Sequence, residues 1–118
     1  MDKYKKIGKK GEIIACEYLK VRNYSILACN YRAERKEIDI IATKNNLLIF
    51  IEVKTRSSHY FGFPEEAVTP AKQENIKEVA MQYLDEHPEY EKIRFDIISI
   101  TLKRQQKPEI MHFEDAFY

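Results

Sequence analysis

The apolar residues of this chain follow helical and strand-like periods, which predict a mixed succession of helices and strands. Over residues 3–21 the apolar positions Ile7, Ile14, Tyr18 and Leu19 recur at helical spacing, which predicts a first helix. Gly8 and Gly11 lie within it and suggest close approach of another backbone, because glycine has no Cβ. Residues 24–29 then have a strand-like pattern.

The strongest strand signals are residues 38–43 and 47–54, both rich in Ile, Leu and Val. Asn45 and Asn46 separate them, and asparagine tolerates positive φ. This pattern predicts a hairpin closed by a two-residue turn.

The second half of the chain predicts a loop, a helix and one or two further strands. Residues 57–64 have a loop-like composition, and Thr69-Pro70 is typical of an N-cap followed by proline in the first helical turn. An apolar stripe then ends near His87-Pro88; it consists of Ile76, Val79, Ala80, Tyr83 and Leu84. Residues 93–102 predict another strand, and residues 110–113 give a weak signal for a last one. We therefore expect an α/β fold in which the second helix can form a right-handed crossover between two strands.

Composition suits one globular domain spanning residues 1–118. Hydrophobic residues make up 44% and charged residues 33% of the 118 residues. The longest apolar run, residues 47–51, is too short to span a bilayer, and residues 1–10 lack the apolar core of a signal peptide. We expect a cytoplasmic protein with no membrane partner. Cys16 and Cys29 form no CxxC pair, so reduced and mostly buried thiols are expected.

The charge is balanced overall but unevenly distributed. A formal net charge of +1 excludes a basic field over the whole surface. Residues 1–10 nevertheless hold five lysines against one aspartate, and residues 103–107 hold three cations. A local basic face and ordinary solvated chain ends both remain open. If nucleic acid is bound, Lys9 and Lys10 are candidates to contact it.

Carboxylates are expected to meet across the predicted hairpin. A two-residue turn pairs Lys44 with Leu47, which places Asp39 opposite Glu52. By the same register Glu37 lies opposite Lys54, and these four residues share one face, away from the apolar residues Ile38, Ile40, Ile51 and Val53.

Two opposed carboxylates about 4.5–5.5 Å apart destabilise a sheet unless a cation compensates them. Mg²⁺ prefers oxygen ligands and commonly uses one or two carboxylates, so it is a candidate. Lys54 could then orient or deprotonate a water, or neutralise charge on a phosphate. The alternative is a salt-bridged sheet face, with Glu37 paired to Lys54 and Asp39 to a neighbouring cation. A bulge at the turn would also change the register.

The stretch EIDIIATKNNLLIFIEVKTR, residues 37–56, resembles the D-(spacer)-E-x-K core of the PD-(D/E)XK nuclease superfamily. More narrowly, GKKGEIIACEYL, NYRAERKEIDIIA, FIEVKTR and RFDIISI together resemble the bacterial YraN family of uncharacterised proteins, over nearly the whole chain. Archaeal Holliday-junction resolvases share the same order of motifs. Two departures are that Lys36 replaces a usual glycine and that Ile38, not proline, precedes Asp39. Neither removes a candidate ligand.

The resemblance implies a restriction-endonuclease-like fold with an α-β-β-β-α-β core and a mixed sheet flanked by helices. It also implies that Asp39, Glu52 and Glu12 hold Mg²⁺ or Mn²⁺ and that Lys54 is catalytic. Arg56, Lys72 and Gln73 match positions beside the site and are expected to contact nucleic acid. From the residues alone, Glu12 suits an exposed helix carboxylate, and Lys72 and Gln73 suit a solvated helix start.

Other motifs are less informative. His59, His87 and His112 show no metal-ligand spacing. Residues 59–63 suit either an aromatic flap that stacks on bases or a loop anchored in the core. Asp96 lies among apolar neighbours, and we expect it to be a structural partner of Arg94 or of the backbone.

The function expected from the resemblance is metal-dependent hydrolysis of DNA phosphodiesters, on branched or structured DNA in repair or recombination. The alternatives are a catalytically inactive nucleic-acid-binding module and a protein-interaction subunit of a DNA-processing system. A homodimer is one assembly that the sequence leaves open.

Overall fold

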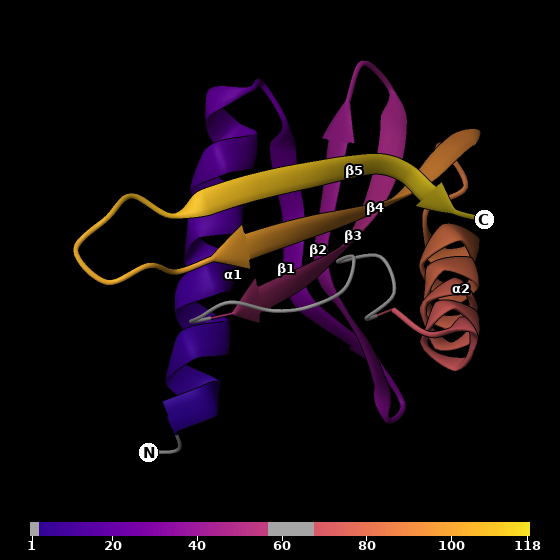
Figure 1. Cartoon of the computed structure of the whole chain (residues 1–118). Helices are drawn as coiled ribbons and strands as arrows, with labels where there is room; N and C mark the ends of the chain where they lie inside the picture. The colour runs from indigo at the N-terminus through magenta and orange to yellow at the C-terminus, as the bar shows by residue number, and fades with distance from the viewer. Residues whose placement is uncertain (1–2, 57–67) are drawn as a thin grey trace.

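A five-stranded mixed sheet forms the centre of the computed structural model, and one helix lies on each of its faces (Figure 1). The structure describes residues 3–56 and 68–118, so the predicted loop and flap at residues 57–64 lie outside the described residues. The elements in chain order are α1 (Lys3–Val21), β1 (Ser25–Ala33), β2 (Lys36–Lys44), β3 (Leu47–Arg56), α2 (Pro70–Glu86), β4 (Lys92–Thr101) and β5 (Glu109–Phe117). The α/β prediction is confirmed.

The strands lie in the order β1-β2-β3-β4-β5. β3 and β4 are parallel and α2 connects them in the chain, whereas the other neighbouring strands are antiparallel. The predicted register of the β2–β3 hairpin is confirmed from Lys44↔Leu47 to Ile40↔Ile51. Asn45 and Asn46 both have positive φ, 52° and 67°, as a tight two-residue hairpin turn requires.

The second helix begins as its sequence predicts. Thr69 is the N-cap, its side chain accepts a hydrogen bond from Lys72 N, and Pro70 follows in the first turn. The sequence predicts only a short last strand at residues 110–113, whereas β5 extends over nine residues. Its apolar pattern is interrupted where the β4–β5 register shifts, near Asp115, which has a φ of 53°.

Each face of the sheet has its own apolar core. Ile40, Ile49 and Ile51 pack with α1, while Phe50 packs with α2. Ile49, Phe50 and Ile51 are fully buried, because helices cover the sheet on both sides. The prediction that Ile38 shares a face with Ile40 is wrong, since Ile38 belongs to the core on the α2 side.

The close approach predicted at the two helix glycines is found at Gly11 alone. A Cβ on Gly11 would overlap the Thr55 side chain, whereas Gly8 has no neighbour within 4 Å of such a Cβ. Glycine at position 11 therefore lets α1 pack tightly against the end of β3, one residue beyond Lys54. Neither helix of the described residues is long and apolar enough to cross a membrane.

Candidate metal and active site

Regular backbone pairing between β2 and β3 ends next to Asp39, and the Asp39 side chain takes part in the hydrogen bonding from that point. The last paired residues are Ile40 and Ile51, one step before Asp39 and Glu52. Continuing the same register would pair Val53 with Ile38, but Val53 N donates instead to Asp39 Oδ2 at 2.8 Å. The carboxylate thus replaces a backbone acceptor at the point where the strands separate, and this fixes its orientation.

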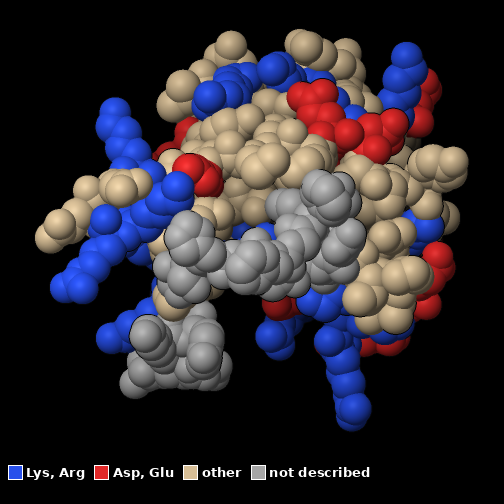
Figure 2. Space-filling view, in the orientation of Figure 1, with Lys and Arg blue, Asp and Glu red and all other residues tan. Residues whose placement is uncertain are grey.

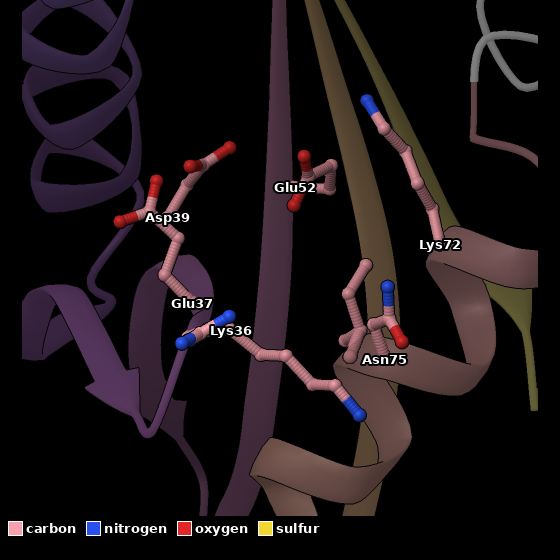
Figure 3. A pocket seen from close by; sticks show the side chains of 8 residues that line it. Lys36, Glu37, Asp39, Glu52, Lys72 and Asn75 are labelled. Atoms are coloured by element: carbon pink, nitrogen blue, oxygen red, sulfur yellow. The ribbon is translucent and has the colours of Figure 1, made fainter.

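A pocket of about 260 Å³ opens beside this point, between β2, β3 and the start of α2. Both Asp39 and Glu52 line it, and Figure 3 shows Lys72 reaching from α2 toward the same space. The complete lining consists of Arg35, Lys36, Glu37, Asp39, Glu52, Lys72, Asn75 and Ile76. The hairpin and the helix therefore place acids and cations around one cavity.

Burial in this pocket disfavours the charged forms of both central acids. Burial raises the pKa of Asp39 to about 6, and the charges of Glu12 and Glu37 add to the rise. Burial also raises the pKa of Glu52 to about 7, with the Asp39 carboxylate as the second cause. At neutral pH the pair is therefore held close to its protonation range.

The carboxylate oxygens that face the pocket are available to a ligand. Among the described residues, Asp39 Oδ1 and both oxygens of Glu52 accept no hydrogen bond. The Glu52 side chain keeps 14% of its surface exposed and Asp39 is half-buried, so solvent reaches both side chains. Carboxylate oxygens in this state can coordinate a hard cation.

Lys54 lies against Glu52 on the same strand. Its Nζ is 3.7 Å from Glu52 Oε1, and the two side chains are 20% and 14% exposed. Burial lowers the pKa of Lys54, and interaction with the neighbouring Lys72 lowers it further. Lys54 is not among the residues that line the pocket.

The capped start of α2 brings Lys72 to the site. Thr69 Oγ1 accepts from Lys72 N at 3.3 Å, which holds the first turn of the helix in place. The charge of Lys72 opposes the rise in the pKa of Glu52. Asn75 and Ile76 follow three and four residues later, and therefore line the pocket from the same helix face.

Glu12 lies near the two acids but outside the pocket lining. Its Oε2 accepts from Asn30 Nδ2 at 3.2 Å, and its charge contributes to the raised pKa of Asp39. The described residues contain no group of three or more His, Cys, Asp or Glu that could hold a metal ion. The structure therefore brings together Asp39 and Glu52, and it does not bring Glu12 into the same ligand set.

Four of the predicted nucleic-acid contacts lie away from the pocket lining. Lys9 and Lys10 are exposed on α1, and Arg56 lies half-buried at the end of β3. The Gln73 side chain donates to the Val68 carbonyl at 3.0 Å, so it supports the helix start. Lys72 is the member of this set that lines the pocket.

The salt-bridged sheet face is not formed in the way the sequence allowed. Glu37 pairs with Arg32 across β1 and β2, at 3.0 Å, and Lys54 lies against Glu52 instead. The charges of Lys54 and Lys72 oppose the raised pKa values of the two central acids without reversing them.

Sequence reasoning missed Arg35, and it treated Lys36 as a departure without a role. Both line the pocket from the tip of the β1–β2 hairpin. Lys36 also forms an ion pair with Glu78, which joins this hairpin to α2. No local pattern indicated these contacts, because they depend on how the hairpin packs against a helix far along the chain.

Asp96 is a structural partner of Arg94 and of the backbone, as predicted. It is fully buried and accepts two hydrogen bonds of 2.8 Å from Arg94 and one of 3.0 Å from Asp115 N. The sequence did not indicate its third partner, His112, whose Nε2 lies 2.7 Å away. His112 Nδ1 in turn contacts Tyr18 of α1 at 3.2 Å, so this network fastens β4 and β5 to the helix.

Basic residues do not form one continuous field on the face shown in Figure 2. Lys and Arg side chains stand in separate groups there, with acidic side chains between them. Any nucleic-acid footprint on this face must therefore be local.

Comparison with known proteins places the whole length of the chain among uncharacterised proteins. The model of a family described as uncharacterised protein family UPF0102 matches residues 11–100. A UPF0102 protein of Alkaliphilus oremlandii is 49% identical over 116 residues, which cover 96% of this chain and 98% of that protein. A UPF0102 protein of Christiangramia forsetii is 42% identical over 100% of this chain and 98% of that protein. One of Dictyoglomus thermophilum is 49% identical over 87% of this chain and 88% of that protein.

Proposed function

This chain belongs to the uncharacterised protein family UPF0102, and we propose that it is a divalent-metal-dependent endonuclease that hydrolyses DNA phosphodiesters. One observation carries the proposal. Asp39 and Glu52 are half-buried and line the same pocket, and the pKa of Asp39 is raised to about 6 and that of Glu52 to about 7. Paired acids with raised pKa values beside lysines are typical of catalytic sites, whereas structural acids are usually compensated by fixed partners.

The residues present fit a magnesium or manganese ion. Mg²⁺ typically takes one or two carboxylates and completes its shell with waters and substrate phosphates, which suits the open oxygens of Asp39 and Glu52. A bound divalent ion supplies Lewis acidity toward a phosphodiester and lowers the pKa of bound water. Glu12, expected from the resemblance as a third ligand, lies outside the pocket lining, so the proposal rests on the two carboxylates.

The protein's own groups have two further roles in the proposed reaction: they orient the Asp39 carboxylate and they stabilise charge on the phosphate. The Val53 N–H donates to one oxygen of Asp39 and restricts the orientation of the carboxylate, which lowers the entropic cost of binding a ligand through its other oxygen. Lys54 and Lys72 approach Glu52 from a strand and a helix. In the proposed reaction a water oxygen attacks phosphorus, the bond to the leaving oxygen breaks, and these ammonium groups stabilise the charge on the phosphate.

The resemblance to PD-(D/E)XK nucleases supports the substrate class. Asp39, Glu52 and Lys54 stand at the spacing of that motif, on two adjacent strands that are flanked by a helix on each face. Arg35, Lys36 and Lys72 add cations at the rim of the pocket, where a phosphate backbone would pass. We propose branched or structured DNA as the preferred substrate, in keeping with the resemblance to junction resolvases.

A cleavage screen tests the proposal. Single-stranded, duplex, flap and four-way DNA, and RNA of the same sequences, are incubated with the protein and Mn²⁺ or Mg²⁺. Cleavage by the wild type that Glu52→Gln abolishes is the expected result. Metal-dependent binding without cleavage on any substrate would instead favour the binding-module alternative, and cleavage of RNA alone would overturn the assigned substrate.

A further inference from the structure

Two cysteines that are distant in sequence meet at the contact between α1 and β1. Cys16 Sγ and Cys29 Sγ lie 3.7 Å apart, although the residues are separated by 13 positions. Cys16 is half-buried, and Cys29 is exposed. The expectation of two mostly buried thiols is therefore wrong for Cys29, because the edge strand β1 leaves this side chain open to solvent.

The two sulfurs lie in non-bonded contact, within reach of a disulfide after a small movement. A disulfide bond is about 2.05 Å long, so the sulfurs must approach by roughly 1.7 Å from their separation of 3.7 Å. Side-chain rotation at the exposed Cys29 can supply most of this movement, because an exposed side chain changes rotamer readily. Both thiols are reduced in the structure.

The same contact between α1 and β1 includes a candidate site residue. Glu12 lies one helical turn before Cys16, on the same side of α1, and Asn30 follows Cys29 directly. The hydrogen bond from Asn30 Nδ2 to Glu12 Oε2 thus runs beside the thiol pair and joins the same two elements. A covalent link here would hold α1, and Glu12 with it, against the edge of the sheet.

We propose that Cys16 and Cys29 form a redox-sensitive thiol pair, which peroxide converts into a disulfide that fastens α1 to β1. The inference rests on the geometry of the thiols and does not depend on the proposed nuclease function. The exposed Cys29 sulfur attacks a peroxide oxygen, the O–O bond breaks, and a sulfenic acid and one water form. Cys16 sulfur then attacks the Cys29 sulfur, and the hydroxyl leaves as a second water. In sum, two thiols and one hydrogen peroxide give one disulfide and two waters.

The two thiols are suited to different steps of this sequence. Burial raises the pKa of Cys16 to about 11, and the contact with Cys29 adds to the rise. Cys16 therefore remains a thiol at neutral pH and is protected from peroxide, while solvent reaches Cys29. This division assigns the first attack to Cys29 and the resolving step to Cys16.

The purified wild-type protein, fully reduced, is treated with a small molar excess of hydrogen peroxide and then unfolded in the presence of a maleimide. Intact mass is expected to show a monomer that is 2 Da lighter than the reduced chain and carries no maleimide. Dithiothreitol is expected to restore both reactive thiols. Because the link closes a loop of about 13 residues, the oxidised monomer should melt roughly 10 °C higher than the reduced one.

Single substitutions separate the roles of the two sulfurs. Cys16→Ser is expected to leave a sulfenic acid at Cys29 that a dimedone probe captures, whereas Cys29→Ser is expected to react with peroxide far more slowly. Two maleimide-reactive thiols after peroxide treatment of the wild type would overturn the proposal. So would covalent dimers as the main product, or sulfinic acid at Cys29 without a disulfide, because each shows that the sulfurs do not meet within one chain.

Discussion

The carboxylate of Asp39 accepts a hydrogen bond of 2.8 Å from the backbone N–H of Val53. This contact lies where β2 and β3 cease to pair regularly, and it takes the place of a backbone-to-backbone bond. A side chain that substitutes for the sheet's own acceptor is held rigidly, and rigid placement is what a metal ligand needs.

Stability without metal should decrease as pH rises through the titration of Glu52. Its pKa is raised in the folded state from 4.5 to about 7, so the folded protein binds more protons than the unfolded chain in that interval. The contribution of Glu52 to stability is therefore fully present below pH 4.5 and is lost as pH rises to about 7. Glu52→Gln removes this penalty, so urea unfolding should show the variant gaining about 2 kcal/mol relative to wild type between pH 5 and pH 8. A difference that does not change with pH would contradict the raised pKa.

Millimolar Mn²⁺ should raise the melting temperature of the wild type and not that of Asp39→Asn. A ligand that binds only the folded state at 100 times its dissociation constant adds about 2.7 kcal/mol of stability. Calorimetry with and without Mn²⁺ measures the shift. Asp85→Asn, an exposed acid on α2, is the matched control and should respond like wild type. An equal shift in Asp39→Asn would place the bound metal elsewhere.

Lys54→Ala should separate metal binding from turnover. The Mn²⁺-induced stabilisation is expected to persist, because a neighbouring cation has been removed from beside Glu52. Cleavage should fall about 10²-fold or more, as when a charge-stabilising group is lost. Lys20→Ala, an exposed lysine of α1, serves as the control in single-turnover assays. Wild-type rates from purified Lys54→Ala would mean that this lysine has no part in cleavage.

Any affinity for DNA should fall steeply with salt and depend on the rim of the pocket. Lys72→Glu places an acid beside Glu52 and should weaken binding by about 10-fold at low salt, with a smaller slope of affinity against salt. Fluorescence anisotropy at several salt concentrations measures both quantities. Reversing Lys9 and Lys10 together tests the footprint expected from sequence. If that double variant binds like wild type while Lys72→Glu does not, the contacts lie on the pocket side alone.

Gly11→Ala should destabilise the fold, although alanine is the better helix former. The added methyl group would overlap Thr55, and overpacking of this kind costs about 1–3 kcal/mol. Gly8→Ala is the matched control in the same helix. A Cβ there has no neighbour within 4 Å, so the variant should gain up to about 1 kcal/mol from helix propensity. Equal stabilisation of both variants in urea unfolding would show that α1 does not pack against Thr55 as described.

Much of the fold could be predicted because it depends on short-range rules. The Asn45-Asn46 turn set the β2–β3 register, and Thr69-Pro70 marked the start of α2. β5 was underestimated, because an edge strand with a bulge buries few of its side chains and so shows little apolar periodicity. The sequence places Ile38 on the wrong face, because the strict alternation of side chains fails near Asp39. The neighbouring strand is irregular at the same level, where Asn30 of β1 has a φ of 54°.

The sequence by itself predicted that Asp39 would approach Glu52 and Lys54, since a two-residue turn sets the register of the hairpin that carries all three. Only the tertiary structure decided which other groups surround them. Lys36 and Lys72 line the same pocket because α2 crosses back over β2, and Cys16 and Cys29 touch because α1 packs against β1. Such contacts join positions far apart in the chain. Their geometry depends on the packing of whole elements, which no local pattern of residues encodes.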